Sequence, residues 1–402
     1  MTQQDERPSP LPNAHQAKCF GCGAEYGLRP ADLGRRSICR NCGRSFYLLP
    51  PSDSPTTVVL LEDPSEGAGS REGRLWLDLR PGQILDGGFL VRRLLGRGGL
   101  SQVFQVLDLQ RNFNLSVKLP LAATLNRLPR DVLINEAAAW LKPAPHPNLV
   151  ACDQVRLYHG LPFIFMEYIQ GLDLARLTSE GRGALYLKPP QASCLELLDI
   201  FIQVTRGLGY AHSLGLYHLD LKPRNVLVEN GGRALIGDYG PVSRETESEI
   251  PDLDEGENQE TRISSARLLG TPQYFSPEAA AGRPGTGGEA DLWALGLTIL
   301  ECFLGCRPWE MGSMAGLALE QYLAENRRPA GLPPGLAGYF RQALAPNPAD
   351  RVREAKAVEE RLTGIYEEAA GRPYGRPEAR AAAETPEGLA RKHASLKEIG
   401  HA

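Results

Sequence analysis

The chain has 402 residues, a length typical of about two to four domains. Hydrophobic residues make up 42% and charged residues 23% of the sequence, so the chain can bury a large core as globular proteins do. The formal net charge is only −4, which excludes the strong overall basic field that draws proteins to nucleic acid or to anionic membranes.

No segment of the sequence predicts a membrane span. The longest apolar run, 292–300, is closed by Asp291 and Glu301, whereas a spanning helix needs about 20 apolar residues. The first residues, Met-Thr-Gln-Gln-Asp-Glu-Arg-Pro, lack the basic and then apolar layout of a secretory signal. We therefore expect a cytoplasmic protein without a membrane span.

The composition divides the chain into five segments. Clusters of polar residues, Pro and Gly mark the termini and a linker, and dense apolar patterning marks the largest folded part. The linker contains one short apolar stretch, 58–61. The segments are a disordered N-terminus 1–15, a compact cysteine-bearing part 16–50, a flexible linker 51–80, a large domain 81–368 and a tail or marginal helix 369–402.

Two Cys-x-x-Cys pairs lie in the segment 16–50. Cys19 and Cys22 form the first pair, Cys39 and Cys42 form the second, and sixteen residues separate the pairs. This spacing supplies four thiolates for one tetrahedral Zn²⁺, and so short a segment needs the metal to fold. We expect a structural zinc ribbon that binds a protein partner or regulates the chain. Free or redox-active thiols are the alternative interpretation, and nucleic-acid binding is unfavoured.

The segment 81–368 changes character along its length. Its first part has short runs typical of strands, interrupted by one helical pattern. Its second part has apolar residues at three- and four-residue spacing, which is typical of helices. The expected strands are 89–95, 103–109, 115–119, 149–158 and 163–168, and the expected helices are 130–141, 195–208 and 292–304. This pattern predicts an α+β fold in which a strand-rich lobe precedes a helical lobe.

A glycine-rich turn follows the first expected strand of this domain. The turn spans 96–103 (GRGGLSQV) and precedes another strand, so its N–H groups can lie over phosphates. Further along, Lys118 stands in an apolar strand, where a lysine is costly unless it is paired, and Glu136 on the next helix is a natural partner. Taken alone, the turn is weak evidence, and the two charged residues by themselves favour surface side chains that keep their charged ends in water.

The segment 218–227 (HLDLKPRNVL) gathers chemistry-bearing side chains in one loop. Asp220, Lys222 and Asn225 belong to it, and Asp238 follows in a turn ahead of a glycine. Phosphoryl transfer needs a carboxylate to orient the attacking hydroxyl, hard oxygen ligands for Mg²⁺ and a lysine to offset charge on the moving group. The loop and the turn together predict this chemistry.

These motifs resemble the catalytic domain of eukaryotic-type serine/threonine protein kinases, in a form similar to bacterial members. The resemblance implies the two-lobed kinase fold, with a β-rich N-lobe at 84–167 and a helical C-lobe at 173–366. In the sequence, both lobes follow the small four-cysteine ribbon. Many motifs in a fixed order carry the resemblance. They are the turn 96–103, Lys118, Glu136, the hinge 166–168, the loop 218–225, Asp238-Tyr-Gly, 270–278 (GTPQYFSPE), 291–296 (DLWALG) and Arg351.

The resemblance implies a set of residues that bind ATP. They come from the turn, the strand after it, the hinge and the strand after the catalytic loop, with Met166 as the gatekeeper. The implied residues are Gly96, Gly98, Ser101 and Val103 of the turn, Lys118 paired with Glu136 for the phosphates, the backbone of Glu167 and Ile169 for the adenine edge, Asp173 for the ribose, and Leu227 against the adenine.

It also implies catalytic and metal-binding roles. Asp220 would accept the proton of the substrate hydroxyl, and Lys222 would contact the γ-phosphate, with Lys118 and Glu136 completing the catalytic set. Asn225 and Asp238 would bind Mg²⁺ or Mn²⁺. Structural roles fall to Asp291, which would anchor the loop backbone, to a buried ion pair between Glu278 and Arg351, and to His212 and His218 as core residues.

The sequence departs from the family pattern at a few positions. Leu219 replaces an arginine that usually pairs with a phosphorylated activation-loop residue, so we expect activity that depends little on phosphorylation of Thr261, Ser264 or Ser265. Ser101, Ser116 and Tyr239 replace Gly, Ala and Phe without removing a reactive group. The insert 245–260 is acidic, and we interpret it as a solvated loop or, alternatively, as an electrostatic brake or a guide for basic substrates.

The sequence thus predicts an ATP- and Mg²⁺-dependent kinase acting on Ser and Thr hydroxyls of protein substrates, and on itself. The ribbon would bind a protein partner or regulate the enzyme. Two alternatives stay open: a catalytically weak pseudokinase scaffold that binds a partner through the ribbon, and a small-molecule kinase of related fold. Lys222 with Thr271 favours Ser and Thr acceptors, and 276–278 (SPE) favours protein substrates.

Overall fold

The computed structural model of the chain divides into two compact units, residues 1–127 and 128–402. It describes residues 15–18, 25–28, 36–38, 40–41, 45–49 and 59–62, then 79–238 without 86–87, 122–123, 125–127, 129, 159 and 180–182, and finally 271–281, 287–324, 331–376 and 386–400.

Two small hairpins begin the first unit. β1 (His15–Lys18) pairs antiparallel with β2 (Glu25–Leu28), and β3 (Arg36–Ile38) pairs antiparallel with β4 (Ser45–Leu49). β5 (Val59–Glu62) pairs with β4 on the side away from β3. The apolar stretch inside the predicted linker is therefore a strand, because a short run of Val and Leu suits a pleated surface.

An antiparallel meander follows in the same unit. The strands that we expect at 89–95, 103–109 and 115–119 are present with shifted ends. Burial alternates along most of the second strand, so that its Phe104 and Val106 point inward. Neighbours in sequence are neighbours in the sheet: β6 (Ile84–Leu85), β7 (Phe89–Arg97), β8 (Ser101–Asp108) and β9 (Phe113–Pro120).

The second unit opens with one helix and a hairpin. α1 (Arg130–Trp140) matches the helix expected at 130–141, and β10 (Cys152–Tyr158) pairs antiparallel with β11 (Leu161–Glu167). Residues 141–151 join α1 to β10, and we refer to them as the α1–β10 connection. Strands therefore dominate the chain before residue 168, and helices dominate after it, as the pattern predicts.

The rest of the second unit is mainly helical. A small antiparallel sheet of β12 (Gly171–Asp173), β13 (Val226–Glu229) and β14 (Ala234–Ile236) carries the loop that holds the candidate site. The described α-helices are α2 (Leu174–Leu177), α3 (Pro190–Ser213), α5 (Pro277–Ala280), α6 (Gly287–Leu304), α7 (Gly312–Ala315), α8 (Leu319–Ala324), α9 (Pro334–Ala343), α10 (Ala355–Ala370) and α11 (Pro386–Gly400).

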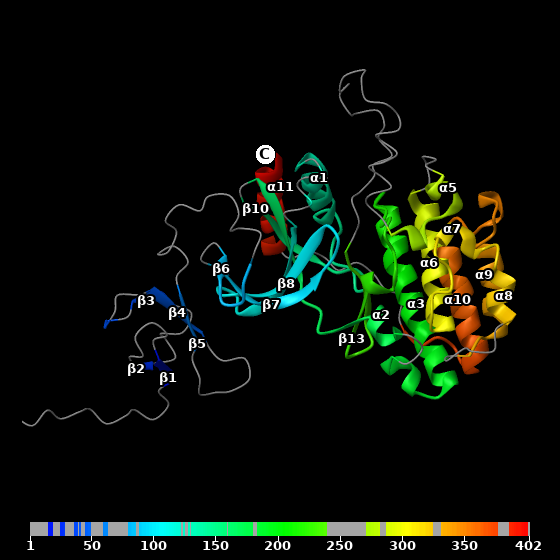
Figure 1. Cartoon of the computed structure of the whole chain (residues 1–402), viewed down its shortest axis with the longest axis horizontal. Helices are drawn as coiled ribbons and strands as arrows, with labels where there is room; N and C mark the ends of the chain where they lie inside the picture. The colour runs from blue at the N-terminus through cyan, green and yellow to red at the C-terminus, as the bar shows by residue number, and fades with distance from the viewer. Residues whose placement is uncertain are drawn as a thin grey trace, which may run out of the picture. The chain divides into compact units, whose positions relative to one another are not determined.

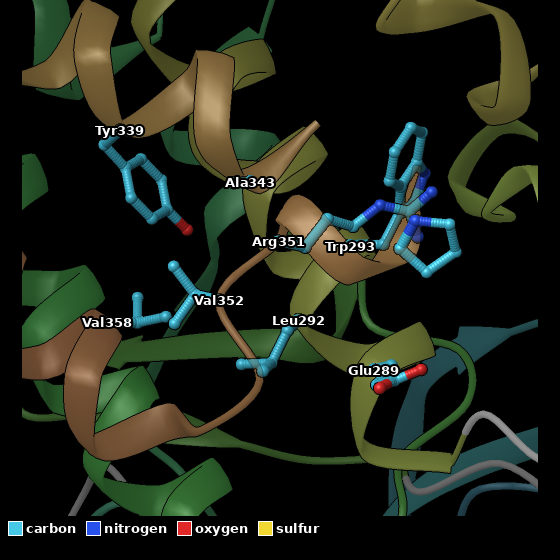
Figure 2. Close-up of a pocket in the computed structure, with 9 residues that line it drawn as sticks. Glu289, Leu292, Trp293, Tyr339, Ala343, Arg351, Val352 and Val358 are labelled. Carbon is cyan, nitrogen blue, oxygen red and sulfur yellow. The ribbon is translucent and has the colours of Figure 1, made fainter. Parts of the chain in front are cut away.

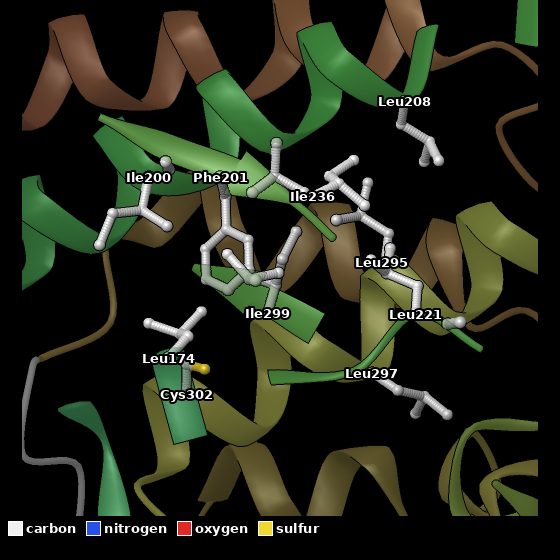
Figure 3. Packing of buried hydrophobic residues seen from close by; sticks show 14 of the residues in the cluster. Leu174, Ile200, Phe201, Leu208, Leu221, Ile236, Leu295, Leu297, Ile299 and Cys302 are labelled. Atoms are coloured by element: carbon white, nitrogen blue, oxygen red, sulfur yellow. The ribbon is translucent and has the colours of Figure 1, made fainter. Parts of the chain in front are cut away.

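One apolar core contains residues of most of these helices, including α3, α6, α9 and α10. α6 is apolar on all sides and almost fully buried, as a central helix must be. It packs beside α3, which in turn packs against α10 (Figure 1). Figure 3 shows Phe201 of α3 with Ile299 and Cys302 of α6 in this core, together with Ile236 of β14. Residues 218–225, which we call the catalytic loop, enter the same core through the buried Leu221. Packing therefore fixes the position of this loop.

The C-terminal stretch differs most from expectation. For 369–402 the sequence predicts only a tail or a marginal helix, because few large apolar residues occur there. α10 ends at Ala370, and Gly371 after it has a φ of 64°, the left-handed conformation that closes many helices. Beyond it, α11 lies beside β10 and α1 (Figure 1). Its described buried side chains are polar, Lys392 and Ser395, which explains why an apolar pattern could not reveal the packing.

Within the described ranges, the structure contains no helix that is both long and apolar enough to cross a membrane. Cys152, Cys194 and Cys302 carry buried thiols, and Cys306 carries an exposed one. Burial raises the pKa of the Cys194 thiol to about 11, which makes it a weak nucleophile at neutral pH.

Candidate active site

A closed ring of hydrogen bonds joins Asp220 to Lys222 and Thr271. The ammonium of Lys222 donates to Asp220 Oδ2 at 2.5 Å and to Thr271 Oγ1 at 2.6 Å. The hydroxyl of Thr271 in turn donates to Asp220 Oδ1 at 2.7 Å. Both carboxylate oxygens are thus oriented, and a positive charge lies beside them. Such a group is placed to accept a proton from a hydroxyl while the lysine offsets negative charge nearby.

Asn225 links this carboxylate to Asp238. Asn225 is buried, and its Nδ2 donates to the Asp220 carbonyl at 2.8 Å, which leaves its Oδ1 as the atom that a hard cation would use. The Gly237 N–H donates to the Asn225 carbonyl at 2.9 Å, and this bond keeps the next residue along the chain close to Asn225. That residue, Asp238, is exposed and has a φ of 56°. An amide oxygen and a carboxylate so arranged fit Mg²⁺ or Mn²⁺ by donor type.

Asp291 of α6 anchors the backbone ahead of Asp220. Its carboxylate is fully buried and accepts the N–H of His218 and the N–H of Leu219, each at 2.7 Å. Nε2 of His212 lies 2.9 Å from the same carboxylate. Leu219 has a φ of 59°, a left-handed conformation that is strained for a residue with a side chain. Asp291 therefore holds the loop in a conformation that its sequence alone would not favour, as the resemblance implies.

His218 does more than fill the core. It is fully buried, but its ring joins both ends of the site: Nε2 lies 3.0 Å from the Gly237 carbonyl, and Nδ1 accepts the Asp220 N–H at 3.2 Å. Because a carbonyl can only accept, Nε2 carries the proton and the ring is the neutral tautomer. The core-packing interpretation of His212 and His218 is thus incomplete, since both rings position site backbone or its anchor. A histidine two residues before Asp220 is the sequence signal for this role.

The hinge residues occupy well-defined positions in the second unit. The carboxylate of Glu167 is held by Arg233, which also pairs with Glu229, so its side chain is not free for a ligand. Hydrogen bonding from Arg233 lowers the pKa of Glu229. The Glu167 N–H donates to the Ala151 carbonyl at 2.9 Å, while Ile169 is buried. The adenine contacts that the resemblance implies for the backbone of Glu167 and Ile169 stay predictions.

Asp173 and Leu227 lie opposite one another on neighbouring strands, β12 and β13. Asp173 caps α2, since its Oδ1 accepts the Arg176 N–H at 2.9 Å, and its other oxygen lies 3.2 Å from the Arg176 guanidinium. The methyl group of Leu227 lies beside Gly237, where an added Cβ would meet it at 3.6 Å. The predicted ribose and adenine contacts therefore start from one sheet, next to the catalytic loop.

In the first unit, three of the residues that the resemblance assigns to ATP binding form one row across the sheet. Gly96 of β7 is in register with Val103 of β8, and Val103 is in register with Lys118 of β9. Residues directly opposite share a face, so the buried Lys118 lies on the same face as Val103. The predicted neighbourhood of these three residues is therefore present within the unit.

Two hydrogen bonds close the turn, one between backbone groups and one from a side chain. The Gly98 N–H donates to the Ser101 carbonyl at 2.8 Å, and the hydroxyl of Thr124 donates to the Leu100 carbonyl at 2.5 Å. A Cβ added at Gly96 or Gly99 would meet no atom within 4 Å, so the glycines leave open space that a phosphate group could use. Glu136, the predicted partner of Lys118, is a partly buried residue of α1, and that pairing stays a prediction.

The predicted structural ion pair is confirmed. The guanidinium of Arg351 donates to Glu278 Oε1 at 2.6 Å and to Oε2 at 3.2 Å, and both side chains are buried. Its carbon lies 4.3 Å from the ring centre of Trp293, beside the small cavity shown in Figure 2. Arg351 also donates to the carbonyls of Ala345 and Pro346, so most of its donors are used.

Several predicted features lie outside the described residues. They include the four ligand candidates Cys19, Cys22, Cys39 and Cys42, the aromatic Tyr239 and the acidic insert 245–260. Among the residues that are described, no cluster of three or more His, Cys, Asp or Glu side chains could hold a metal ion.

The arrangement of these side chains suits phosphoryl transfer of the kinase type, and the comparison with known proteins identifies the family. Residues 89–359 match the protein kinase domain family, so the chain belongs to that family. Serine/threonine-protein kinase pkn3 of Myxococcus xanthus is 30% identical over 299 residues, which cover 70% of this chain and 50% of the relative. Serine/threonine-protein kinase SSK22 of Saccharomyces cerevisiae is 32% identical over 224 residues, which cover 54% of this chain and 16% of the relative.

Among solved structures, the PknI kinase domain of Mycobacterium tuberculosis superposes with a TM-score of 0.52 at 24% identity, covering 71% of this chain and 99% of that domain. At this identity, the likeness shows the two-lobed kinase fold alone. The matches to curated relatives such as these span between 15% and 62% of the relatives' own length.

Proposed function

We propose that this chain is a protein serine/threonine kinase that transfers the γ-phosphate of ATP to hydroxyl groups of protein substrates, itself included. The observation that carries the proposal is the ring of Asp220, Lys222 and Thr271. Membership of the protein kinase family supports it, and two named relatives are serine/threonine-protein kinases.

Each side chain has one chemical task in this proposal. Asp220 orients the substrate hydroxyl and takes its proton as the phosphorus–oxygen bond forms, and Lys222 offsets the charge on the transferred group. The row of Gly96, Val103 and Lys118 holds the nucleotide phosphates and the adenine. Asn225 and Asp238 would hold Mg²⁺, which when bound neutralises phosphate charge and fixes the phosphate oxygens.

The choice of acceptor follows from the same ring. Because Thr271 lies between Lys222 and Asp220, its hydroxyl narrows the space beside the carboxylate. A Ser or Thr side chain brings its hydroxyl close to the substrate backbone and suits such a site, whereas the tyrosine ring carries its hydroxyl much further out. We therefore propose Ser and Thr as the acceptors.

The test is phosphate transfer from ATP and Mg²⁺ to the chain and to panels of Ser-, Thr- and Tyr-containing peptides, followed by intact-mass spectrometry. Asp220→Asn keeps the shape of the side chain and removes its basicity, so we expect kcat to fall by about 10²- to 10⁴-fold. Asp350→Asn, at an exposed position away from the site, is the matched control and should transfer at the wild-type rate.

Two outcomes would reject the proposal. Equal transfer by wild type and Asp220→Asn would place the chemistry elsewhere. Absence of transfer to any acceptor, with ATP still bound, would favour the scaffold alternative, in which the fold serves to bind a partner.

For the N-terminal part we propose a structural zinc ribbon that binds a protein partner or regulates the kinase. Its support is topological. Cys19 follows β1 directly and Cys39 follows β3 directly, so each Cys-x-x-Cys pair lies in the connection of an antiparallel hairpin. Two hairpins that each present two thiolates supply the four ligands of a closed tetrahedral site.

A further inference from the structure

The C-terminal helix α11 covers the corner between α1 and β10 in the second unit (Figure 1). It buries polar side chains there, because Lys392 is only 7% exposed and Ser395 only 3%. A buried ammonium or hydroxyl costs free energy unless it is hydrogen-bonded. The hydrogen-bond partners of these two side chains therefore show which segments α11 holds in place.

Both side chains bind the backbone of the corner. Lys392 Nζ donates to the carbonyl of Pro143, just beyond the end of α1, at 2.6 Å. The Ser395 hydroxyl accepts the N–H of Val155 on β10 at 2.9 Å. Next to them, the guanidinium of Arg391 pairs with Asp153 at 3.0 Å. α11 is thus tied to the end of α1 and to the strand that follows it.

The α1–β10 connection is also held by α3. The N–H of Ala144 donates to the Tyr210 hydroxyl at 3.2 Å, and the Tyr210 ring stacks on His146 with ring centres 4.8 Å apart. Asn148 donates to the side chain of Gln203 at 3.2 Å and to the Ala234 carbonyl at 2.9 Å. The connection is therefore clamped twice, and the second clamp comes from a helix at the far end of the sequence.

We propose that Lys392 and Ser395 are positioning residues for phosphoryl transfer. By fixing the end of α1, they hold Glu136 of the same helix where the reaction requires it. This inference rests on the proposed kinase function and on the pairing of Glu136 with Lys118 that the resemblance implies. It makes α11 an activity-determining part of the chain, acting through α1 and not through contact with substrate or ATP.

The test uses full-length chains with single substitutions. Lys392→Met keeps the length of the side chain and removes the donor, and we expect at least a fivefold fall in kcat/KM for ATP, the low end of couplings between distant sites. Lys392→Arg retains a donor and should restore most of the activity. Lys397→Met, the same change at an exposed position of the same helix, is the matched control and should behave as wild type.

Two readouts separate positioning from a loss of folded protein. A smaller active fraction lowers kcat and leaves KM for ATP unchanged, whereas displacement of Glu136 raises KM for ATP and leaves KM for the peptide unchanged. In addition, a chain that already carries Glu136→Gln should lose little more on adding Lys392→Met, because both changes act on one element.

Hydrogen exchange tests the contact without reference to activity. Lys392→Met should speed exchange in α1 and β10 and leave α3 unchanged. Equal kinetics for Lys392→Met and Lys397→Met, full additivity with Glu136→Gln, or unchanged exchange in α1 would each overturn the inference. If wild type transfers no phosphate, the proposed function fails instead, and the exchange in α1 still decides whether α11 positions that helix.

Discussion

Leu219 occupies a left-handed conformation immediately before the candidate catalytic carboxylate. For an ordinary L-residue this conformation costs on the order of 1–2 kcal/mol, so neighbouring bonds must hold it. Asp291 supplies them through the two N–H groups of His218 and Leu219. The direction in which Asp220 points is thus set by a residue of another element, α6.

We expect Asp291→Asn to lower kcat about 10- to 100-fold, because the new amide N–H₂ would face donors and release the strained backbone. KM for ATP should change much less, since the hydrogen bonds of Asp291 go to the loop backbone and to His212. Steady-state kinetics with a peptide acceptor would measure both constants. Leu219→Gly, which suits the same φ, should keep kcat near wild type, and a kcat for Asp291→Asn within twofold of wild type would contradict the argument.

The residues of the catalytic loop could be predicted from the sequence because they are near one another along the chain. Asp220, Lys222 and Asn225 lie within one short loop, and the loop's own hydrogen bonds bring them together. The roles of Thr271 and His212 could not be derived in this way. They reach the site from distant segments, and only the packing of α3, α6 and the segment before α5 decides where they lie.

At the scale of elements, the buried pair of Glu278 and Arg351 joins α5 to the segment after the short helix Pro348–Asp350. Burial has the largest single effect and would raise the pKa of Glu278. The hydrogen bonds from Arg351, from its own backbone N–H and from Ser276, together with the charge of Arg351, outweigh burial and lower the pKa. The native state therefore binds this proton less tightly than the unfolded chain. The pair stabilises the fold above the ordinary glutamate pKa, and this stabilisation is lost as pH falls through the lowered native value.

Glu278→Gln should cost about 3–5 kcal/mol of unfolding free energy at pH 7, since it leaves the Arg351 charge buried without its partner. The difference from wild type should shrink as the pH falls below the ordinary glutamate range. Urea unfolding at a series of pH values would measure it. Glu320→Gln breaks an exposed pair with Arg341 and is the matched control, with almost unchanged stability. A pH-independent difference for Glu278→Gln would contradict the linkage.

Periodic apolar patterns predicted the elements that bury apolar side chains. The strands β7, β8 and β9 and the helices α1, α3 and α6 follow from such patterns, although their ends shift. α11 could not be predicted as a docked helix, because the described residues it buries, Lys392 and Ser395, are polar and bind backbone groups. The sequence places β5 in a linker, because four residues between polar stretches are too short a pattern to indicate a strand.

At the scale of the whole molecule, the two Cys-x-x-Cys pairs belong to a part of the chain with very little apolar material. The hairpins β1–β2 and β3–β4 are each only a few residues long, and isolated hairpins of this size are marginal in water. The region around the catalytic loop, in contrast, has its own extensive core in α3, α6 and α10. The cysteine-bearing hairpins should therefore need bound metal to fold, whereas the region around the catalytic loop should fold on its apolar core.

We expect one Zn²⁺ per chain, measured by elemental mass spectrometry on protein purified without added metal. Cys22→Ser together with Cys42→Ser should abolish zinc binding, and a strong chelator should release the metal and increase hydrogen exchange in β1 to β4, because ligand binding supplies the folding free energy of such small parts. Exchange in α3 and α6 should not change, since the described residues of their core include no group of three or more side chains that could hold a metal ion. The exposed thiol Cys306 provides the matched control, and Cys306→Ser should retain full zinc content. Zinc content that survives the double substitution would show that the pairs are not the ligands, and increased exchange in α3 on chelation would show that the core depends on the metal as well.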